Sequence, residues 1–228
     1  MVGPRGAPEQ VCGRYTLGTD EEALIEAFDV PSLTFECVAR YNIAPGQQAP
    51  VVAEDRQGRR IGQLTWGLVP SWVDTPKSGL INARCESVAS KPSFREAFQR
   101  RRCLVPADGF YEWKRTAAGK VPHWFHAPDG GVLSFAGIWE SWSRPGFDPR
   151  FTFAILTTDA NEDTAPVHDR MPVVVDARDR DSWLARTTDE STLLALLRPA
   201  PAGTFAAHAV STRVNRVSED DPGLVERG

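Results

Sequence analysis

The sequence predicts a single compact α+β domain whose core is a mainly antiparallel, barrel-like β-sheet with short helices at its flanks. The chain has 228 residues, of which 41% are hydrophobic and 25% charged, so one large core can be buried. Short strand-like runs follow one another with turn clusters between them, which is typical of antiparallel sheets. Helices and strands do not alternate regularly, which disfavours a doubly wound parallel sheet.

Four stretches have the pattern of short helices. "TDEEALIEAF" starts with a capping box from Thr19 to Glu22, and "PSFREAFQRR" repeats that signature from Ser93 to Glu96. Near the C-terminus, "DRDSWLA" and "DESTLLALL" predict two more helices.

The expected strands lie between these helices and are rich in β-branched and aromatic residues. In chain order they are "PVVAE", "IGQLTWG", "CLVPA", "GFYEWK", "PHWFHA", "VLSFAGIW", "FTFAILTT", "MPVVV" and "AAHAVST". Turn clusters such as "DRQG", "TAAGK", "APDGG" and "SRPGFD" separate them.

The domain is expected to span residues 12–220, with a leader at 1–11 and a tail at 221–228. Both ends, 1–10 and "SEDDPGLVERG", are expected to be poorly ordered. No apolar run approaches the roughly 18 residues that cross a bilayer. The leader lacks the apolar segment of a secretory signal. These features predict a cytoplasmic protein without membrane contact.

The charge and the cysteines exclude several classes of protein. A net charge of −4 argues against coating of nucleic acid by the whole surface but allows a local basic groove. The four cysteines are scattered without a C-x-x-C pair, so neither a disulfide framework nor a zinc site is expected. We predict that Cys37, Cys85 and Cys103 are small buried apolar residues. No metal or organic cofactor is suggested.

Several short motifs are richer than packing requires. They are "VCGRY", "RYNIAPGQ", "WGLVPSW", "INARCES", "GFYEWK" and "PVHDRMP". In "INARCES", Asn82, Arg84 and Glu86 alternate, so on a strand they would share one face. Each motif also has a plain structural interpretation, because a lone histidine such as His168 is more often structural than catalytic. Trp66 is expected in the core.

Taken together and in this order, these motifs closely resemble the SRAP family, the SOS response-associated peptidase proteins, which process abasic sites in DNA. The resemblance runs from Cys12 to Val217 and implies the SRAP fold. In this family the cysteine becomes the first residue and forms a thiazolidine with the ring-opened aldehyde of an abasic site in single-stranded DNA.

This chemistry requires a free α-amine and a thiol on one residue. The amine condenses with the aldehyde to an imine, and the sulfur then closes a five-membered ring. With pKa values of about 8 for the amine and about 8.5 for the thiol, both groups are partly available near neutrality. An internal cysteine has its nitrogen in an amide and cannot react in this way.

The resemblance also implies roles for residues outside the first motif. Glu112 would move protons during imine formation and ring closure, and His168 would protonate the sugar oxygen as the ring opens. Asn82 would hold the amine or a sugar hydroxyl, and Thr157 in "ILTT" would line the same pocket.

Contacts to the DNA follow from the same resemblance. Arg14, Arg84 and Arg170 would contact phosphates, an attraction that is independent of sequence and weakened by salt. Pro45–Gly46 and Trp72 would shape the groove, with the indole stacking on a base beside the lesion. The family's second tryptophan in this loop is Val73 here, which weakens the expected wedge between bases.

Cys12 is internal in the sequence as written, and three explanations compete. Translation could start at Val11, if a GUG codon there is read as methionine, and removal of that methionine would expose Cys12. Alternatively, the leader could be trimmed by proteolysis or self-cleavage. The third possibility is that the leader is retained and the protein binds DNA without crosslinking. The first explanation is favoured.

Three functions are therefore compared. The first is crosslinking of abasic sites in single-stranded DNA, with a lyase side reaction through the imine, by a monomer that is nucleoid-associated when crosslinked. The second is a thiol peptidase that pairs Cys12 with His168. The third is a lesion-binding module without catalysis. The clustering of Cys, Asn, Glu and His motifs favours the first function over the third, and a requirement for a free N-terminus would separate the first from the second.

Overall fold

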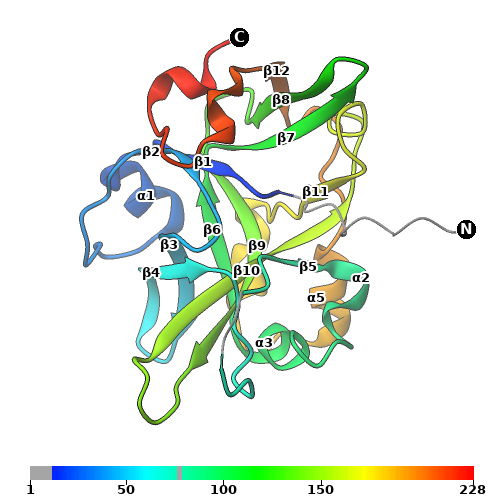
Figure 1. Ribbon diagram of the computed structural model, residues 1–228. Coiled ribbons are helices and arrows are strands. Elements are labelled where there is room, and N and C mark those ends of the chain that lie inside the picture. The colour runs from blue at the N-terminus through cyan, green and yellow to red at the C-terminus, as the bar shows by residue number, and fades with distance from the viewer. Residues whose placement is uncertain (1–11, 76–78) are drawn as a thin grey trace, which may run out of the picture.

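A computed structural model describes residues 12–75 and 79–228, and the expected leader at 1–11 lies outside these residues. Within them, the chain forms two β-sheets with short helices at the periphery (Figure 1). The predicted α+β class with a mainly antiparallel, barrel-like core is confirmed. No helix in the described part of the chain is long and apolar enough to cross a membrane.

The larger sheet closes on itself. It contains β3 (Gln48–Asp55), β4 (Gly58–Trp66), β6 (Arg102–Ala107), β9 (Leu133–Trp142) and β10 (Arg150–Asp159), and its strand order is β11-β10-β4-β3-β6-β9. An additional pairing of β9 with β10 completes the ring. Because β10 runs parallel to β4 and antiparallel to β9, the barrel is antiparallel except at one seam.

Two short strands extend β10 beyond this ring. β5 (Asn82–Arg84) pairs parallel to β10 with Asn82 beside Ile155, and β11 (Arg170–Pro172) pairs antiparallel with Pro172 beside Thr157. The C-terminal half of β10 is therefore the place where the "INARCES", "ILTT" and "PVHDRMP" motifs meet.

The smaller sheet carries the start of the described chain. Its order is β12-β8-β7-β1-β2, made of β1 (Tyr15–Leu17), β2 (Arg40–Ile43), β7 (Gly109–Thr116), β8 (Gly119–His126) and β12 (Ala206–Ala209). β1 lies between β7 and β2, antiparallel to both, and Tyr15 pairs with Phe110. β1 and β2 were not among the expected strands, because three or four residues give too short an alternation to recognise.

Two of the predicted caps do not form, and the described residues form five α-helices, four of them where expected and one more directly after β5. They are α1 (Glu21–Phe28), α2 (Cys85–Val88), α3 (Arg95–Arg100), α4 (Arg180–Leu184) and α5 (Glu190–Leu196), with 3₁₀ turns at Ala177–Asp179, Thr212–Asn215 and Pro222–Val225. Asp20 rather than Thr19 caps α1, because the Thr19 hydroxyl bonds Asp108 instead. α3 has no side-chain cap, so the capping box from Ser93 is wrong.

The core joins the two sheets through aromatic side chains. The ring of Tyr15 on β1 stands edge-on to Trp66 on β4 at 5.2 Å between centroids, and it also contacts Phe135 on β9. Trp66 is 1% exposed, which confirms its predicted core role. Among the cysteines expected to be buried, Cys103 is buried as predicted. Cys37 and Cys85 are only half-buried because they lie at the edges of the packed elements.

The C-terminal segment is packed, contrary to the expectation for "SEDDPGLVERG". The Asp220 carboxylate accepts hydrogen bonds from the backbone nitrogens of Tyr41, at 2.5 Å, and Asn42, at 3.0 Å, and it pairs with Arg40. Leu224 is fully buried in a small second core with Tyr111. The polar composition of this segment suggested disorder. In the structure, however, the Asp220 carboxylate accepts hydrogen bonds from the backbone of β2, and this contact orders the segment.

Replacing Asp220 by alanine is expected to lower the free energy of unfolding by about 2 kcal/mol, because hydrogen bonds to a charged acceptor are lost and buried donors remain. Urea denaturation monitored by tryptophan fluorescence measures this loss. Asp148→Ala, a change at an exposed position on the β9–β10 connection, serves as the control and should stay within about 0.5 kcal/mol of wild type. Equal effects of the two changes would show that the segment does not clamp β2.

Candidate functional site

The backbone nitrogen of Cys12 donates a hydrogen bond of 2.6 Å to Oε1 of Glu112. The strand register produces this contact, because Tyr111 on β7 donates to the carbonyl of Arg14 and aligns the residues before β1 with β7. Cys12 is 0% and Glu112 2% exposed. The two residues that sequence analysis ranked first are therefore in direct contact and shielded from bulk water.

This burial controls the thiol. Loss of hydration raises the pKa of the Cys12 thiol well above its ordinary value, and the negative charge of Glu112 raises that pKa further. The sulfur is therefore a neutral thiol at neutral pH. Reaction at sulfur requires removal of its proton, and Glu112 is the carboxylate placed beside it.

His168 lines a cleft of about 260 Å³ beside β7. The cleft is lined by Trp113, Lys114 and Arg115 of β7 and by Pro166, Val167, His168 and Asp169 of the loop before β11. Because Trp113 directly follows Glu112 on β7, the cleft brings His168 to the strand that holds the Cys12–Glu112 pair.

The ring of His168 is oriented by its own loop. The backbone nitrogen of Arg170 donates to Nδ1 at 3.1 Å, while a carboxylate oxygen of Asp169 also lies 3.1 Å from Nδ1. One nitrogen cannot accept and donate at once, and the backbone donor is fixed. The bond from Arg170 therefore favours the tautomer that carries its proton on Nε2.

Arg170 is buried and connects the loop to its neighbours. Its Nη1 contacts the carboxylates of Glu86 and Asp159, and its Nη2 donates to Glu86 at 3.0 Å and to the carbonyl of Thr157 at 2.7 Å. The guanidinium is thus engaged inside the protein. This corrects the prediction of a phosphate contact by Arg170, whose role here is to position the segment that carries His168.

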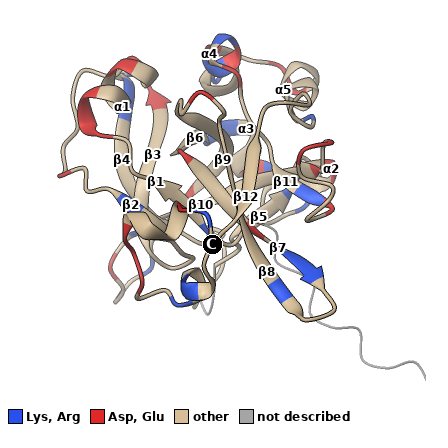
Figure 2. Cartoon of the chain, turned by 90° about the horizontal axis from the view of Figure 1, so that it is seen from above, with Lys and Arg blue, Asp and Glu red and all other residues tan. Residues whose placement is uncertain are grey.

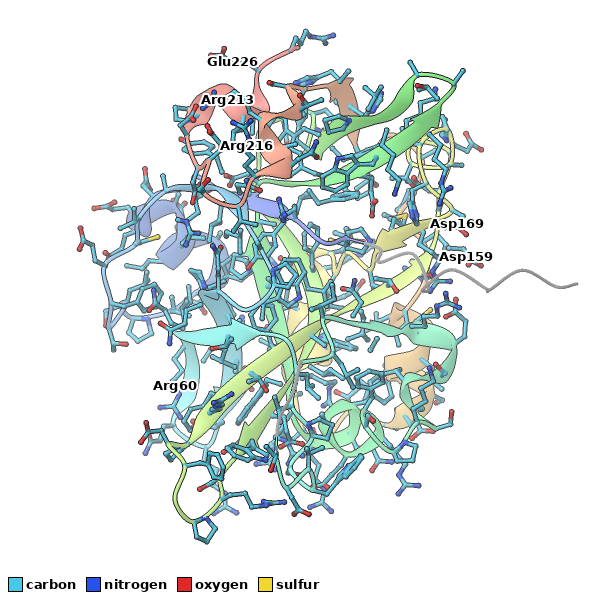
Figure 3. All side chains as sticks on the ribbon, viewed as in Figure 1. Arg60, Asp159, Asp169, Arg213, Arg216 and Glu226 are labelled. Carbon is cyan, nitrogen blue, oxygen red and sulfur yellow. The ribbon has the colours of Figure 1, made fainter. Side chains whose placement is uncertain are left out.

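The prediction that Glu86 shares a strand face with Asn82 and Arg84 is wrong. β5 ends at Arg84 and Glu86 lies in the first turn of α2, where it reaches Arg170. Figure 3 shows Asp159 and Asp169 at the same edge of the molecule, and the backbone nitrogen of Ala160 donates to the carbonyl of Asp169.

Asn82, Thr157 and Arg84 meet on the β5–β10 ladder. Asn82 pairs beside Ile155, two residues before Thr157, and Thr157 pairs beside Arg84. Asn82 is half-buried, Thr157 is 1% exposed and Arg84 is exposed. The ladder thus provides two polar groups at the site and one cation at its surface.

Arg14 is held by the C-terminal half of the chain. Its Nη1 donates to the carbonyl of Val214 at 2.7 Å and lies 3.2 Å from Oδ1 of Asn42. Asn42 is itself buried and donates to the carbonyls of Val214, Arg216 and Glu219. Partial burial lowers the pKa of the Arg14 guanidinium.

Pro45 and Gly46 form a turn at a second, larger cleft of about 670 Å³. The backbone nitrogen of Gln47 donates to the carbonyl of Ala44, and Gly46 has φ of +87°, as the third position of a type II turn requires. Arg150 is the only charged residue among the described residues that line this cleft. The structure therefore separates the expected groove-shaping turn from the cleft that holds His168.

Trp72 is 60% exposed, so its indole presents a face to solvent. The loop beneath it is anchored, because the indole nitrogen of Trp142 donates to the carbonyl of Val73 at 2.6 Å. Sequence analysis did not single out Trp113 and Lys114 as site residues. Their position directly after Glu112 in "GFYEWK" was the available signal.

The fold and site define an α+β protein in which a buried cysteine contacts a buried carboxylate of β7 and a histidine lines a cleft beside the same strand. A family model described as "SOS response associated peptidase (SRAP)" matches residues 11–217 of the chain. The chain belongs to the SRAP family.

Relatives and solved structures agree with this assignment. The chain is 38% identical to "Abasic site processing protein YoqW" of Bacillus subtilis (strain 168) over 95% of this chain and 99% of that protein. It is 33% identical to "Abasic site processing protein HMCES" of Gallus gallus over 80% of this chain and 64% of that protein. A crystal structure of a Bacteroides thetaiotaomicron protein shares the fold with a TM-score of 0.83 at 23% identity, covering 95% of this chain and all of that one.

The ion pair between Glu86 and Arg170 makes stability depend on pH. The hydrogen bond from Arg170 lowers the pKa of Glu86 in the folded protein. The ion pair therefore stabilises the fold above about pH 4.3, the pKa of an unfolded glutamate, and this stabilisation is lost as the pH falls through the lower pKa of the folded state. Because Glu86 is half exposed, Glu86→Gln is expected to cost no more than about 1 kcal/mol at neutral pH.

Urea unfolding of wild type and Glu86→Gln at about pH 7 and about pH 3 tests this, since the difference should shrink at the lower pH. Glu162→Gln, at an exposed position in the loop that leads to His168, is the control. A difference that is independent of pH would rule out the ion pair as its cause.

Proposed function

We propose that this protein processes abasic sites in single-stranded DNA by linking covalently to them through Cys12. The observation that carries the proposal is the 2.6 Å contact between the Cys12 nitrogen and the buried Glu112 carboxylate. Membership of the SRAP family and the names of the relatives support it. The reactive form is proposed to begin at Cys12, because only then is this nitrogen an amine.

The first step would take place at the nitrogen. The amine attacks the C1′ aldehyde of the ring-opened sugar, the carbon–nitrogen bond forms, and the resulting carbinolamine loses water to give an imine. Glu112 accepts a proton from the ammonium group and returns one to the departing hydroxyl. A carboxylate within hydrogen-bond distance of the reacting nitrogen is suited to both transfers.

The second step would take place at the sulfur. The thiol adds to the imine carbon, a carbon–sulfur bond forms, and the thiol proton passes to the imine nitrogen by way of Glu112. The sum of both steps is the loss of one water. Because burial keeps the Cys12 thiol protonated, Glu112 has to act on the sulfur as well as on the nitrogen.

His168 would open the sugar. The imidazolium form of His168, with Nδ1 beside the Asp169 carboxylate, would give its Nε2 proton to the sugar ring oxygen. The bond from that oxygen to C1′ breaks, and the C1′ hydroxyl releases its proton as the aldehyde forms. Asn82 and Thr157, on neighbouring strands, would hold the sugar hydroxyls or the amine.

The DNA would be held mainly through its backbone. Exposed Arg84 and half-buried Arg14 are the proposed phosphate contacts, and the exposed indole of Trp72 is the proposed stacking surface. Pro45 and Gly46 would line the path of the strand where it passes the larger cleft.

A peptidase that pairs Cys12 with His168 is less well supported. Such enzymes need a thiol whose pKa is lowered by a neighbouring imidazolium. Here burial and Glu112 raise the pKa of the Cys12 thiol instead. A lyase reaction is compatible with the proposed imine, because that intermediate can undergo β-elimination.

A form of the protein that begins at Cys12 is expected to yield a stable adduct with single-stranded DNA containing one abasic site. Intact mass under denaturing conditions should give the sum of protein and DNA minus one water. The full chain and Cys12→Ala are the controls and should give none. Absence of an adduct from the form that begins at Cys12 would refute the proposal.

Glu112→Gln in the same form is expected to slow adduct formation about 100-fold or more, the usual contribution of a positioned acid–base group. The same change should lower the pKa of the Cys12 thiol, because a negative charge beside it is removed. Quenched time courses measure the rate, and the pH titration of thiolate ultraviolet absorbance, against a Cys12→Ser background, measures the pKa.

Glu140→Gln neutralises another buried carboxylate, which lies on β9 and pairs with Arg101, and is the matched control. It should change neither the rate nor the thiol pKa. If Glu112→Gln lowered the thiol pKa and left the rate unchanged, Glu112 would not be the proton carrier.

A further inference from the structure

The β7–β8 hairpin concentrates positive charge in a chain whose net charge is −4. Residues 113–128 contain Lys114, Arg115 and Lys120 and no aspartate or glutamate. Figure 2 shows blue segments and no red on the outer parts of β7 and β8. All three basic side chains are exposed.

The register of the hairpin places like charges opposite each other. Arg115 pairs directly with Lys120, and Lys114 pairs with Val121. Like charges at directly opposite positions destabilise a strand pair. The hairpin therefore gathers several cationic side chains on one two-stranded ribbon, which suits an anionic ligand.

The half of β7 nearest the turn of the hairpin forms one wall of the His168 cleft. Lys114 and Arg115 line this cleft together with Trp113, Val167 and His168, and Asp169 is the one acidic residue among the described residues of the lining. The Asp169 carboxylate lies against Nδ1 of His168, so its charge is directed to the histidine side of the cleft.

Trp113 gives this wall a fixed aromatic surface. Its indole nitrogen donates to Oδ1 of Asn215 at 2.8 Å, and the ring packs against the small core that contains Tyr111 and Val214. The side chain is nevertheless only half-buried. Sites for single-stranded nucleic acid combine cations that track phosphates with aromatic side chains on which bases stack.

We propose that this cleft is a nucleotide subsite of the DNA-binding surface. Lys114 and Arg115 bind the phosphodiester groups of the nucleotide next to the abasic sugar, and Trp113 stacks on its base. The subsite and the β5–β10 ladder each contribute cations, so the strand crosses the reacting groups between two cationic walls. The inference rests on the proposed function, because it takes single-stranded DNA as the ligand.

The test measures reversible binding, which separates it from the covalent chemistry. The full chain is titrated into a labelled single-stranded oligonucleotide that carries a tetrahydrofuran abasic analogue, which cannot open to an aldehyde. Fluorescence anisotropy gives the dissociation constant at several salt concentrations. Lys114→Ala/Arg115→Ala is expected to reduce the slope of log K against log salt by about 1.4, that is, about 0.7 for each phosphate that is no longer neutralised.

Arg56→Ala/Arg198→Ala removes the same charge from exposed positions on the β3–β4 turn and after α5, and should leave the slope close to that of wild type. Trp113→Leu should weaken binding about 5-fold to 150-fold through the loss of one stacked base, and Trp113→Phe should recover most of that loss. Thermal unfolding confirms that each variant is folded.

Equal slopes for the two double variants would overturn the proposal, as would equal affinities of Trp113→Leu and Trp113→Phe. A second readout uses oligonucleotides shortened from either side of the lesion. The effect of Lys114→Ala/Arg115→Ala should disappear when one particular side is shortened and persist when the other is. Failure of the proposed function would be recognised by a different result. The form that begins at Cys12 would then give no adduct, whatever the salt dependence of reversible binding.

Discussion

The hydrogen bond from Cys12 to Glu112 joins residues 100 positions apart, and the arrangement of the site depends on it. Both partners are buried, so the bond forms where no water competes for either group. The same burial keeps the thiol of Cys12 neutral and makes the carboxylate its main electrostatic neighbour. A strand of three residues, β1, holds this geometry because its neighbours β7 and β2 fix it from both sides.

Much of the fold could be predicted because its longer strands have clear composition and clear turn signals. The barrel closes through β9 and β10, two of the longest expected runs, with Phe135 and Phe153 buried as their patterns require. The short strands β1, β2 and β5 were not predicted, because pairing with neighbouring strands, rather than their own residue pattern, stabilises them. The capping signals at Thr19 and Ser93 misled for different reasons. The Thr19 hydroxyl bonds Asp108 instead of its helix, and α3 begins at Arg95 with no side-chain cap.

The sequence predicted which residues belong to the candidate site but not which of them are in contact. Cys12 and Glu112 were singled out from motifs, yet only the register of β1 against β7 shows that they touch. Arg170 illustrates the limit most clearly, because its sequence context beside His168 resembles a surface DNA contact. Its guanidinium instead meets Glu86 and the carbonyl of Thr157, groups that a linear sequence places far away. A buried cation with several partners aligns three segments, because it joins α2 through Glu86 and β10 through Asp159 and Thr157 to its own strand β11.

The bond between Arg14 and the carbonyl of Val214 spans 200 residues, and Asn42 and Asp220 extend this contact across β2. Contacts of such separation form late, because the intervening chain has to be ordered before they gain anything. On a ribosome, the segment that follows Cys12 therefore waits for residues near 220 to emerge before its final hydrogen bonds can form. The surroundings of a cysteine close to the start of the domain are in this sense completed last, so incomplete chains stay without the finished site while synthesis continues.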